Sequence, residues 1–425
     1  MKEKVDTIVI GARQLLTCAA PHGALRGEQM QQVGLIENGA LAIQDGRIIA
    51  VGEQNEILQR YQADQQLDCR GKVITPALVD PHTHVVYAGD RIAEFELRIK
   101  GASYMEIMQA GGGILSTMHA TRSATIQQLV DKTTVRLNQM LRVGTATAEV
   151  KTGYGLDTET ELKLLQAIEL LDKRHPITLI PTFLPAHAVP PEYEGRADEY
   201  IQLIIDDMLP QAWAWYQQSH FAAQNIPFSI DVFCEEGVFT LEQSHRVLDA
   251  GKRLGMQVKA HVDEFVHLGG VPMALSLGAV SVDHLDATPP EDITTLAQSN
   301  AVAIVIPTVN FNLGSTHFAD ARAIIDSGAA LALTTDINPG SALCPSMPMA
   351  MAIACRYQKL LPSEALIAST INAAYAIGLA DKVGSLEVGK WADFLIIDTT
   401  DYRHLAYQFG VNLVEAVFKR GQQVI

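Results

Sequence analysis

The pattern of hydrophobic and polar residues changes twice along the chain. Up to about residue 75, short apolar stretches alternate with Gly and Asp turn signals, as in "GALAIQDGRIIAVG" at 39–52. This pattern is typical of strands joined by tight turns. It returns after about residue 380, in "VGSLEVGKWADFLIIDTTD" at 383–401. We therefore predict a small composite β-sandwich domain built from both chain termini, residues 1–75 plus 380–425.

Between these two ends, short apolar stretches alternate with longer helical patterns. Helix candidates such as "TETELKLLQAIELLDKR" (158–174) and "TLEQSHRVLDAGKRLG" (240–255) begin at Thr and end near Lys or Gly, as capping and the helix dipole favour. Apolar strands that alternate with helices indicate a parallel sheet covered by helices, and eight strands close a barrel. We predict an α/β fold, a (β/α)8 TIM barrel over residues 76–379. Its strands are expected at 77–80, 145–150, 177–183, 229–234, 257–261, 281–285, 301–307 and 330–336.

Composition and charge narrow the classes of partner. The chain is 48% hydrophobic and 19% charged, an ordinary globular mixture. Its net charge of −16 argues against nucleic acid and requires a local basic pocket for any anionic substrate. The five widely spaced cysteines form no CxxC pair and indicate reduced thiols. The N-terminal apolar stretch is too short for a signal peptide or membrane helix, so we predict a soluble, cytoplasmic protein without a membrane partner.

Polar residues stand at the C-terminal ends of several of these strands. His82 and His84 follow the first strand, His261 ends the fifth, His284 the sixth and Asp336 the eighth. In a TIM barrel, these strand ends form the mouth that holds the active site. One histidine at a strand end is more often a hydrogen-bonded structural residue than a ligand. Together, however, the imidazoles and the carboxylate suit zinc or iron, so we predict a metal site with His82, His84, His261 and Asp336 as ligands.

Glu264 lies three residues after His261. It could be a solvated loop carboxylate, or a general acid/base beside the metal. A metal would lower the pKa of its bound water to roughly 7, and Glu264 could then pass the water's proton to a leaving nitrogen. His284 would orient the water or polarise the carbonyl. We therefore predict hydrolysis or deamination, with Glu264, His284 and Asp336 as catalytic residues.

This ligand pattern resembles the mononuclear arrangement of the amidohydrolase superfamily. That pattern has HxH after strand one, His on strand five in an H-x-x-E element, His on strand six and Asp on strand eight. Over essentially the whole length, the chain resembles the imidazolonepropionase family within it. The segments that carry this resemblance are "DPHTHVVYAGDR" (80–91), "GGGILSTMHATR" (111–122), "EVKTGYGL" (149–156), "FLPAHAVP" (183–190), "HVDEF" (261–265) and "TDINPGS" (335–341).

The resemblance implies a reaction and a pocket. Such enzymes open the cyclic amide of 4-imidazolone-5-propanoate with water, giving N-formimidoyl-L-glutamate in histidine degradation. It also implies one Zn²⁺ or Fe³⁺ per subunit, a small anionic substrate and a homodimer. Arg91 could hold the propionate as a bidentate fork. The resemblance places Arg91, Tyr104, Tyr154 and His187 in the substrate pocket. Glu264 would also contact the substrate, and the residues that follow Asp336 would line the same mouth: Asn338, Gly340 and Ser341.

Several alternatives stay open at this point. Arg91 could instead be a surface ion-pair residue with Glu94 or Glu96. Lys151 and Glu235 end strands two and four, and either could support a second metal ion, although we favour one. The alternative function is another mononuclear amidohydrolase, a cyclic-amidine or nucleobase deaminase, which would release ammonia.

Overall fold

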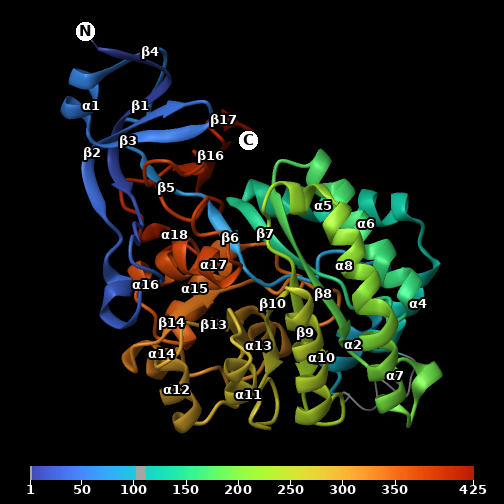
Figure 1. Cartoon of the computed structure of the whole chain (residues 1–425). Coiled ribbons are helices and arrows are strands. Elements are labelled where there is room, and N and C mark those ends of the chain that lie inside the picture. The colour runs from blue at the N-terminus through green and yellow to red at the C-terminus, as the bar shows by residue number, and fades with distance from the viewer. Residues whose placement is uncertain (1, 102–111) are drawn as a thin grey trace.

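The structure, a computed structural model, describes residues 2–101 and 112–425 and contains a β domain and a barrel (Figure 1). The β domain is one eight-stranded sheet in the order β17-β16-β15-β5-β1-β2-β3, with β4 beside β1. Antiparallel pairing of β5 with β15 joins strands from the two ends of the chain, which confirms the predicted composite domain. Its strands are β1 (Glu3–Leu16), β2 (Leu35–Gln44), β3 (Arg47–Glu53), β4 (Tyr61–Asp68), β5 (Val73–Pro76), β15 (Phe394–Ile397), β16 (Val414–Lys419) and β17 (Gln422–Gln423).

The sheet buries apolar side chains on both of its faces. Successive residues of a strand point to opposite faces. Val9 and Leu41 accordingly belong to one apolar cluster, while Ile8 and Ala42 belong to another. β5 ends at Pro76 and the first barrel strand begins at Leu78, so the chain passes directly from one part to the other. The division into 1–75 plus 380–425 and 76–379 remains our proposal.

The barrel contains all eight predicted strands, in parallel. Its ladder runs β14-β13-β12-β11-β9-β8-β7-β6, with β10 beside β9. The fifth predicted strand is broken into β10 and β11 around Lys259 and Ala260. The strands are β6 (Leu78–Asp80), β7 (Thr145–Lys151), β8 (Thr178–Ala186), β9 (Ser229–Cys234), β10 (Gln257–Val258), β11 (His261–Val262), β12 (Ser281–His284), β13 (Val302–Val305) and β14 (Ala330–Leu333).

A buried aspartate closes the barrel between β6 and β14. No ladder pairing joins these two strands in the part of the chain that the structure describes. Instead, Asp80 accepts hydrogen bonds from the hydroxyl groups of Thr334 and Thr335 and, at 3.1 Å, from the Thr335 backbone N–H. Beyond this seam, the His84 N–H donates to the Ile337 carbonyl at 3.0 Å. Asp80 therefore holds the end of β6 against the segment after β14.

Helices surround the barrel, as the alternating pattern predicts. Thr240 caps α10 in a capping box with Gln243, and Gly255 ends that helix with a φ of +105°. α6 is capped by Asp157, one residue before the predicted start. The main helices are α2 (Ile92–Ile99), α4 (Ile114–Ser123), α5 (Ile126–Arg142), α6 (Thr158–Arg174), α7 (Ala197–Leu203), α8 (Leu209–Gln218), α10 (Leu241–Leu254), α11 (Gly270–Ser276), α12 (Pro290–Ala297), α13 (Pro307–Leu313), α14 (Ala321–Asp326), α15 (Met347–Tyr357), α16 (Pro362–Ala368) and α17 (Ile371–Ala376).

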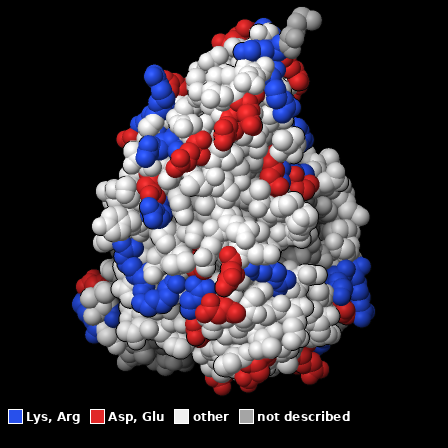
Figure 2. All heavy atoms as spheres, turned by 90° about the vertical axis from the view of Figure 1, so that its left-hand side faces the viewer, with Lys and Arg blue, Asp and Glu red and all other residues white. Residues whose placement is uncertain are grey.

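The distribution of surface charge and the character of the helices can be compared with the expectation of no nucleic-acid and no membrane partner. On the face that Figure 2 presents, acidic and basic side chains are interspersed and leave a broad stretch without either. This face therefore lacks the continuous basic stripe that nucleic-acid binding requires. Among the helices of the described residues, none has both the length and the apolar character needed to span a membrane.

Candidate metal centre and substrate pocket

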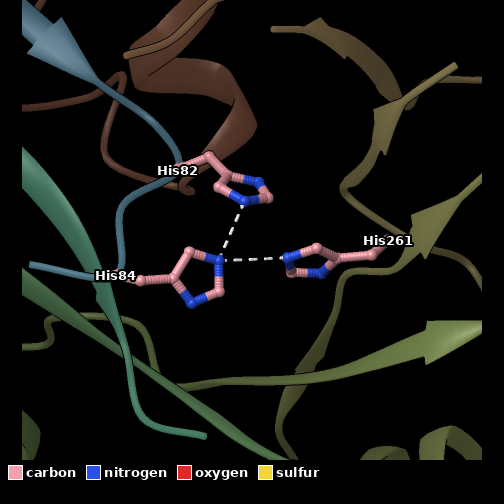
Figure 3. Close-up of side chains that lie close together, drawn as sticks. All are labelled: His82, His84 and His261. Atoms are coloured by element: carbon pink, nitrogen blue, oxygen red, sulfur yellow. Dashed lines mark hydrogen bonds between the residues drawn. The ribbon is translucent and has the colours of Figure 1, made fainter. Parts of the chain in front are cut away.

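Three imidazole nitrogens converge at the mouth of the barrel. His82 and His84 lie on the segment after β6, and His261 begins β11 on the other side of the mouth (Figure 3). His84 Nε2 lies 3.3 Å from His82 Nε2 and 3.2 Å from His261 Nε2. Asp336, just after β14, places Oδ1 at 3.5 Å from His82 Nε2 and 3.6 Å from His84 Nε2. The structure thus brings together all four predicted ligands.

These distances fit one bound metal ion. A tetrahedral ion with bonds of about 2.0–2.1 Å keeps neighbouring ligand atoms about 3.3 Å apart. The separations of 3.2–3.6 Å agree with that value. Asp336 Oδ1 is buried and has no hydrogen-bond partner among the described residues, although a carboxylate oxygen there needs one. The donor set and its geometry therefore suit a zinc or iron ion.

Carboxylates behind the imidazoles set which nitrogen is free. His82 Nδ1 lies 2.7 Å from Asp283 Oδ2, and His261 Nδ1 lies 3.1 Å from Asp231 Oδ1. A neutral imidazole that donates its Nδ1–H presents an unprotonated Nε2 to a metal. Burial, assisted by Lys151 and the other histidines, also holds the pKa of His82 well below its ordinary value. Both effects prepare Nε2 as a ligand.

A buried lysine compensates these carboxylates. Lys151 Nζ lies 2.7 Å from Glu149 Oε1, 2.6 Å from Asp231 Oδ2 and 3.6 Å from Asp283 Oδ2. Burial alone would lower its pKa, but Asp231, Glu149 and Asp283 raise that pKa above its ordinary value. Lys151 is therefore a charged ammonium here, and a carboxylated lysine would face three carboxylates. We call Glu149, Lys151, Asp231, Lys259 and Asp283 the polar core.

The Glu235 carboxylate is engaged in backbone hydrogen bonds rather than placed to bind a second metal ion. It accepts backbone hydrogen bonds from Phe265 at 2.9 Å, Val266 at 3.1 Å and Glu236 at 2.9 Å. It thereby fixes the loop that carries Glu264. The contacts of Lys151 and Glu235 favour a centre with a single ion.

Glu264 and His284 face each other beside the four predicted ligands. His284 Nδ1 lies 3.7 Å from Glu264 Oε2, and the His284 and His261 rings are 5.2 Å apart. His284 adopts a φ of +84°, which is strained for a residue with a side chain. Burial, together with Asp336 and Asp286, raises the pKa of Glu264 well above its ordinary value. A raised pKa makes the ionised carboxylate a stronger base, which suits a group that takes a proton and then passes it on.

Arg91 is paired with Glu94, and the pair is largely buried rather than exposed on the surface. Its Nε donates to Glu94 Oε2 at 2.8 Å, and the Arg91 side chain is only 13% exposed. Glu96 pairs with Lys100 instead. A Cβ at Gly340 would lie 2.2 Å from an Arg91 guanidinium nitrogen, so only glycine permits this approach.

The residues after Asp336 build the turn on which Arg91 rests. Asn338 Oδ1 accepts from the backbone N–H groups of Gly340 at 2.8 Å and Ser341 at 2.7 Å. Its amide nitrogen donates to the Asp336 carbonyl at 2.8 Å. Asn338 therefore shapes the loop, while Gly340 contacts Arg91 directly and Ser341 is half-buried at the same turn.

Two further predicted pocket residues lie against His84. The His187 ring stacks on His84 with centroids 4.9 Å apart, and the Tyr154 ring lies 5.9 Å from His84. His187 Nδ1 donates to the Gly153 carbonyl at 3.0 Å, which leaves Nε2 as an acceptor. Burial lowers the pKa of His187 to about 3 and raises that of Tyr154. Tyr104 lies outside the described residues.

Some residues of the site were not predicted from the sequence. Asp231 and Asp283 lie inside apolar strands, in "SIDVFC" and "SVDHL", one or more positions before the strand ends. A charged residue within a buried strand was the available signal. Glu94 and Arg98 lie on α2: Glu94 accepts from the Gly113 N–H at 2.9 Å, and Arg98 donates to the Gly340 carbonyl at 2.7 Å.

Comparison with known sequences finds close relatives. The model of the Amidohydrolase family matches residues 237–424. Imidazolonepropionase of Chloroflexus aggregans is 56% identical over 423 residues, which covers 100% of this chain and 99% of the relative. Imidazolonepropionase of Herpetosiphon aurantiacus is 50% identical over 419 residues, covering 99% and 97%.

Comparison with solved structures supports the fold. An adenosine deaminase from Xanthomonas campestris with bound zinc superposes with a TM-score of 0.71 at 20% identity, covering 100% of this chain and 93% of the other. Guanine deaminase of E. coli gives a TM-score of 0.72 at 18% identity, with 99% of both chains covered. Proteins with different named activities thus share this fold, so substrate specificity must come from the residues of the pocket.

Proposed function

The chain belongs to the imidazolonepropionase family of the amidohydrolase superfamily, and we propose on that basis how it hydrolyses the ring of 4-imidazolone-5-propanoate. The product is N-formimidoyl-L-glutamate, a step of histidine degradation. The observation that carries the proposal is the convergence of three Nε2 atoms and Asp336 Oδ1 beside Glu264, with a buried arginine at the same mouth.

We propose that His82, His84, His261 and Asp336 hold one ion per subunit. This ion is Zn²⁺ or Fe³⁺, because a set of three histidines and one aspartate suits both. When bound, it supplies a Lewis acid that polarises a carbonyl and makes a water more acidic. The hydrogen bonds of His82 to Asp283 and of His261 to Asp231 support this assignment, since they orient two ligands.

Glu264 moves the proton in this scheme. The water oxygen bonds to the ring carbonyl carbon, the amide C–N bond breaks, and the nitrogen must receive a proton. Glu264 takes that proton from the water and delivers it to the departing nitrogen. His284, 3.7 Å from Glu264, hydrogen-bonds the carbonyl or the water and orients it. Asp336 helps to orient the water from the other side.

The pocket holds the propionate of the substrate. Arg91 is the positive group, and its buried position near the mouth lets it act against the overall net charge of −16. His187, Tyr154 and Tyr104 contact the substrate in our proposal. Asn338, Gly340 and Ser341 contribute by the turn that supports Arg91. We also propose a homodimer that works in the cytoplasm, where the five free cysteines stay reduced.

The test is turnover of freshly made 4-imidazolone-5-propanoate, followed by loss of its ultraviolet absorbance. Hydrolysis of the ring amide consumes substrate without releasing ammonia, whereas a nucleobase or cyclic-amidine deaminase releases one ammonia per turnover. Glu264→Gln should lower kcat about 10²–10⁴-fold, the usual contribution of a general acid/base. Ammonia release, or full activity of Glu264→Gln, would overturn the corresponding part of the proposal.

A further inference from the structure

We propose a second divalent-metal site, formed by Asp263, His267 and Asp292, that takes a first-row ion such as Zn²⁺. The three residues offer one imidazole nitrogen and two carboxylate oxygens, all within 4.8 Å of one another. Asp263 and His267 lie on the loop after β11, and Asp292 lies in the first turn of α12. The site shares no ligand with the centre at the strand ends.

Two buried carboxylate oxygens point into this site without a hydrogen-bond partner. Asp263 is 1% exposed and Asp292 is 8% exposed. Asp263 Oδ2 accepts from the Thr288 hydroxyl at 2.8 Å, but Asp263 Oδ1 and Asp292 Oδ2 have no hydrogen-bond partner in the described part of the chain. A buried carboxylate oxygen is costly unless a donor or a cation satisfies it. This pair of atoms therefore requires a cation or a donor.

His267 alone does not satisfy both oxygens. Its Nδ1 lies 3.4 Å from both Asp263 Oδ1 and Asp263 Oδ2, and 3.7 Å from Asp292 Oδ2. A charge-assisted hydrogen bond would be about 2.7–2.9 Å long, so none of these contacts is a short ion pair. Ligands of a shared ion with bonds of about 2.0–2.2 Å instead lie roughly 3.0–3.5 Å apart, which is close to these separations.

The charge around the site also calls for a cation. No lysine or arginine of the described residues lies within 4.0 Å of either carboxylate, and His267 is their one basic neighbour. An ion of charge +2 would balance the two carboxylates. Mixed nitrogen and carboxylate ligands select a first-row transition ion over Mg²⁺ or Ca²⁺, which prefer oxygen alone. The His267 side chain is 40% exposed, so solvent can reach the site.

The position of the site gives the ion a mechanical role. Asp263 immediately precedes Glu264, and Glu235 already fixes the next two backbone N–H groups. An ion held by Asp263, His267 and Asp292 would tie this loop to α12. It would thereby restrain the loop that carries Glu264, in addition to the hydrogen bonds of Glu235. This role does not depend on which substrate the enzyme opens.

Metal stoichiometry tests the proposal. The full-length protein is stripped with a chelator, reloaded with Zn²⁺, dialysed and analysed for zinc per chain. We expect two ions in the native chain, one in His267→Gln and one in Asp336→Asn, which lacks a ligand of the first centre. His119→Gln, a change at an exposed histidine on α4, should keep two. One ion in the native chain, or two in His267→Gln, would overturn the second site.

A second variant separates a metal site from a plain ion pair. In the stripped protein, Asp292→Asn should raise Tm, because it removes one of two facing carboxylates. The native chain should gain a further rise in Tm when the second equivalent of Zn²⁺ is added, and Asp292→Asn should not. If His267 simply forms an ion pair, Asp292→Asn lowers Tm in the stripped protein and the second equivalent changes nothing, which would contradict the proposal.

Discussion

The polar core and the mouth of the barrel both contain buried carboxyl groups, but their charges are balanced in opposite ways. In the polar core, burial would raise the pKa of Asp231, but His261 and Lys151 hold it well below its ordinary value. At the mouth, burial raises the pKa of Glu264, and that of Asp286 reaches about 7. Among the described residues, the donors to the Asp286 carboxyl group are neutral: the Asn310 amide and the Ala319 backbone N–H.

This difference suits the two regions to different roles: the polar core orients the histidines, and the mouth transfers protons. Carboxylates that stay ionised keep the Nδ1 protons of His82 and His261 in place, so the Nε2 atoms proposed as ligands have a fixed orientation. Carboxyl groups with raised pKa values hold a proton more firmly than ordinary ones, which suits proton transfer. The polar core therefore keeps its carboxylates charged, whereas carboxyl groups at the mouth can gain and lose a proton.

The largest expected effect comes from removing a ligand at the boundary between the two regions. His261→Ala should lose the first ion and reduce kcat by at least about 10³-fold, because a metal supplies several kcal/mol of charge stabilisation in the transition state. Metal analysis and turnover measure this result. His119→Ala is the control on the exposed face of α4. A His261→Ala protein that keeps its zinc content would disprove the assignment.

The next effect tests the polar core itself. Lys151→Met leaves Glu149, Asp231 and Asp283 without their shared ammonium, and we expect the free energy of unfolding to fall by about 3–5 kcal/mol. Urea unfolding measures this loss. Lys259→Met is the matched control, because Lys259 donates to Ser281 at 2.7 Å and lies 3.7 Å from Asp283. Equal losses in both variants would mean that Lys151 has no special role.

The two regions also differ in how far the sequence predicts them. An apolar strand in a parallel sheet fixes where its next polar residue lies, so the strand pattern alone places His261, His284 and Asp336 at one mouth. The seam at Asp80 could not be predicted, because it depends on two strands that meet without ladder bonds. Contacts such as that of Arg91 with Gly340 join loops that are far apart in sequence. The periodicity of hydrophobic residues cannot predict such contacts.

A third prediction uses the pH dependence of the mouth. Because the folded pKa of Asp286 is about 7 instead of its ordinary 3.8, the folded state binds more protons between these values, and stability should fall as pH rises through this window. Asp286→Asn removes the cost of ionising this carboxyl group in the folded state, but it keeps an oxygen that can accept from Asn310. We expect it to gain about 2–4 kcal/mol over the native chain at pH 8, since each pKa unit corresponds to ~1.4 kcal/mol. Urea unfolding at pH 8 and pH 4 measures this, and an equal gain at pH 4 would contradict it.

The smallest expected effect tests whether substrate recognition belongs to the mouth alone. Arg91→Ala should raise KM for 4-imidazolone-5-propanoate about ten- to hundredfold, because a hydrogen bond to a charged group contributes ~1.5–3 kcal/mol. Metal content should stay unchanged, since the contacts of Arg91 are with Glu94 and the Gly340 turn rather than with the ligands. Glu94→Gln is the matched control: it keeps the arginine, removes the competing charge, and should leave KM unchanged or lower. A KM close to native in Arg91→Ala would place propionate recognition elsewhere in the pocket, and a loss of metal would show that the two regions are coupled.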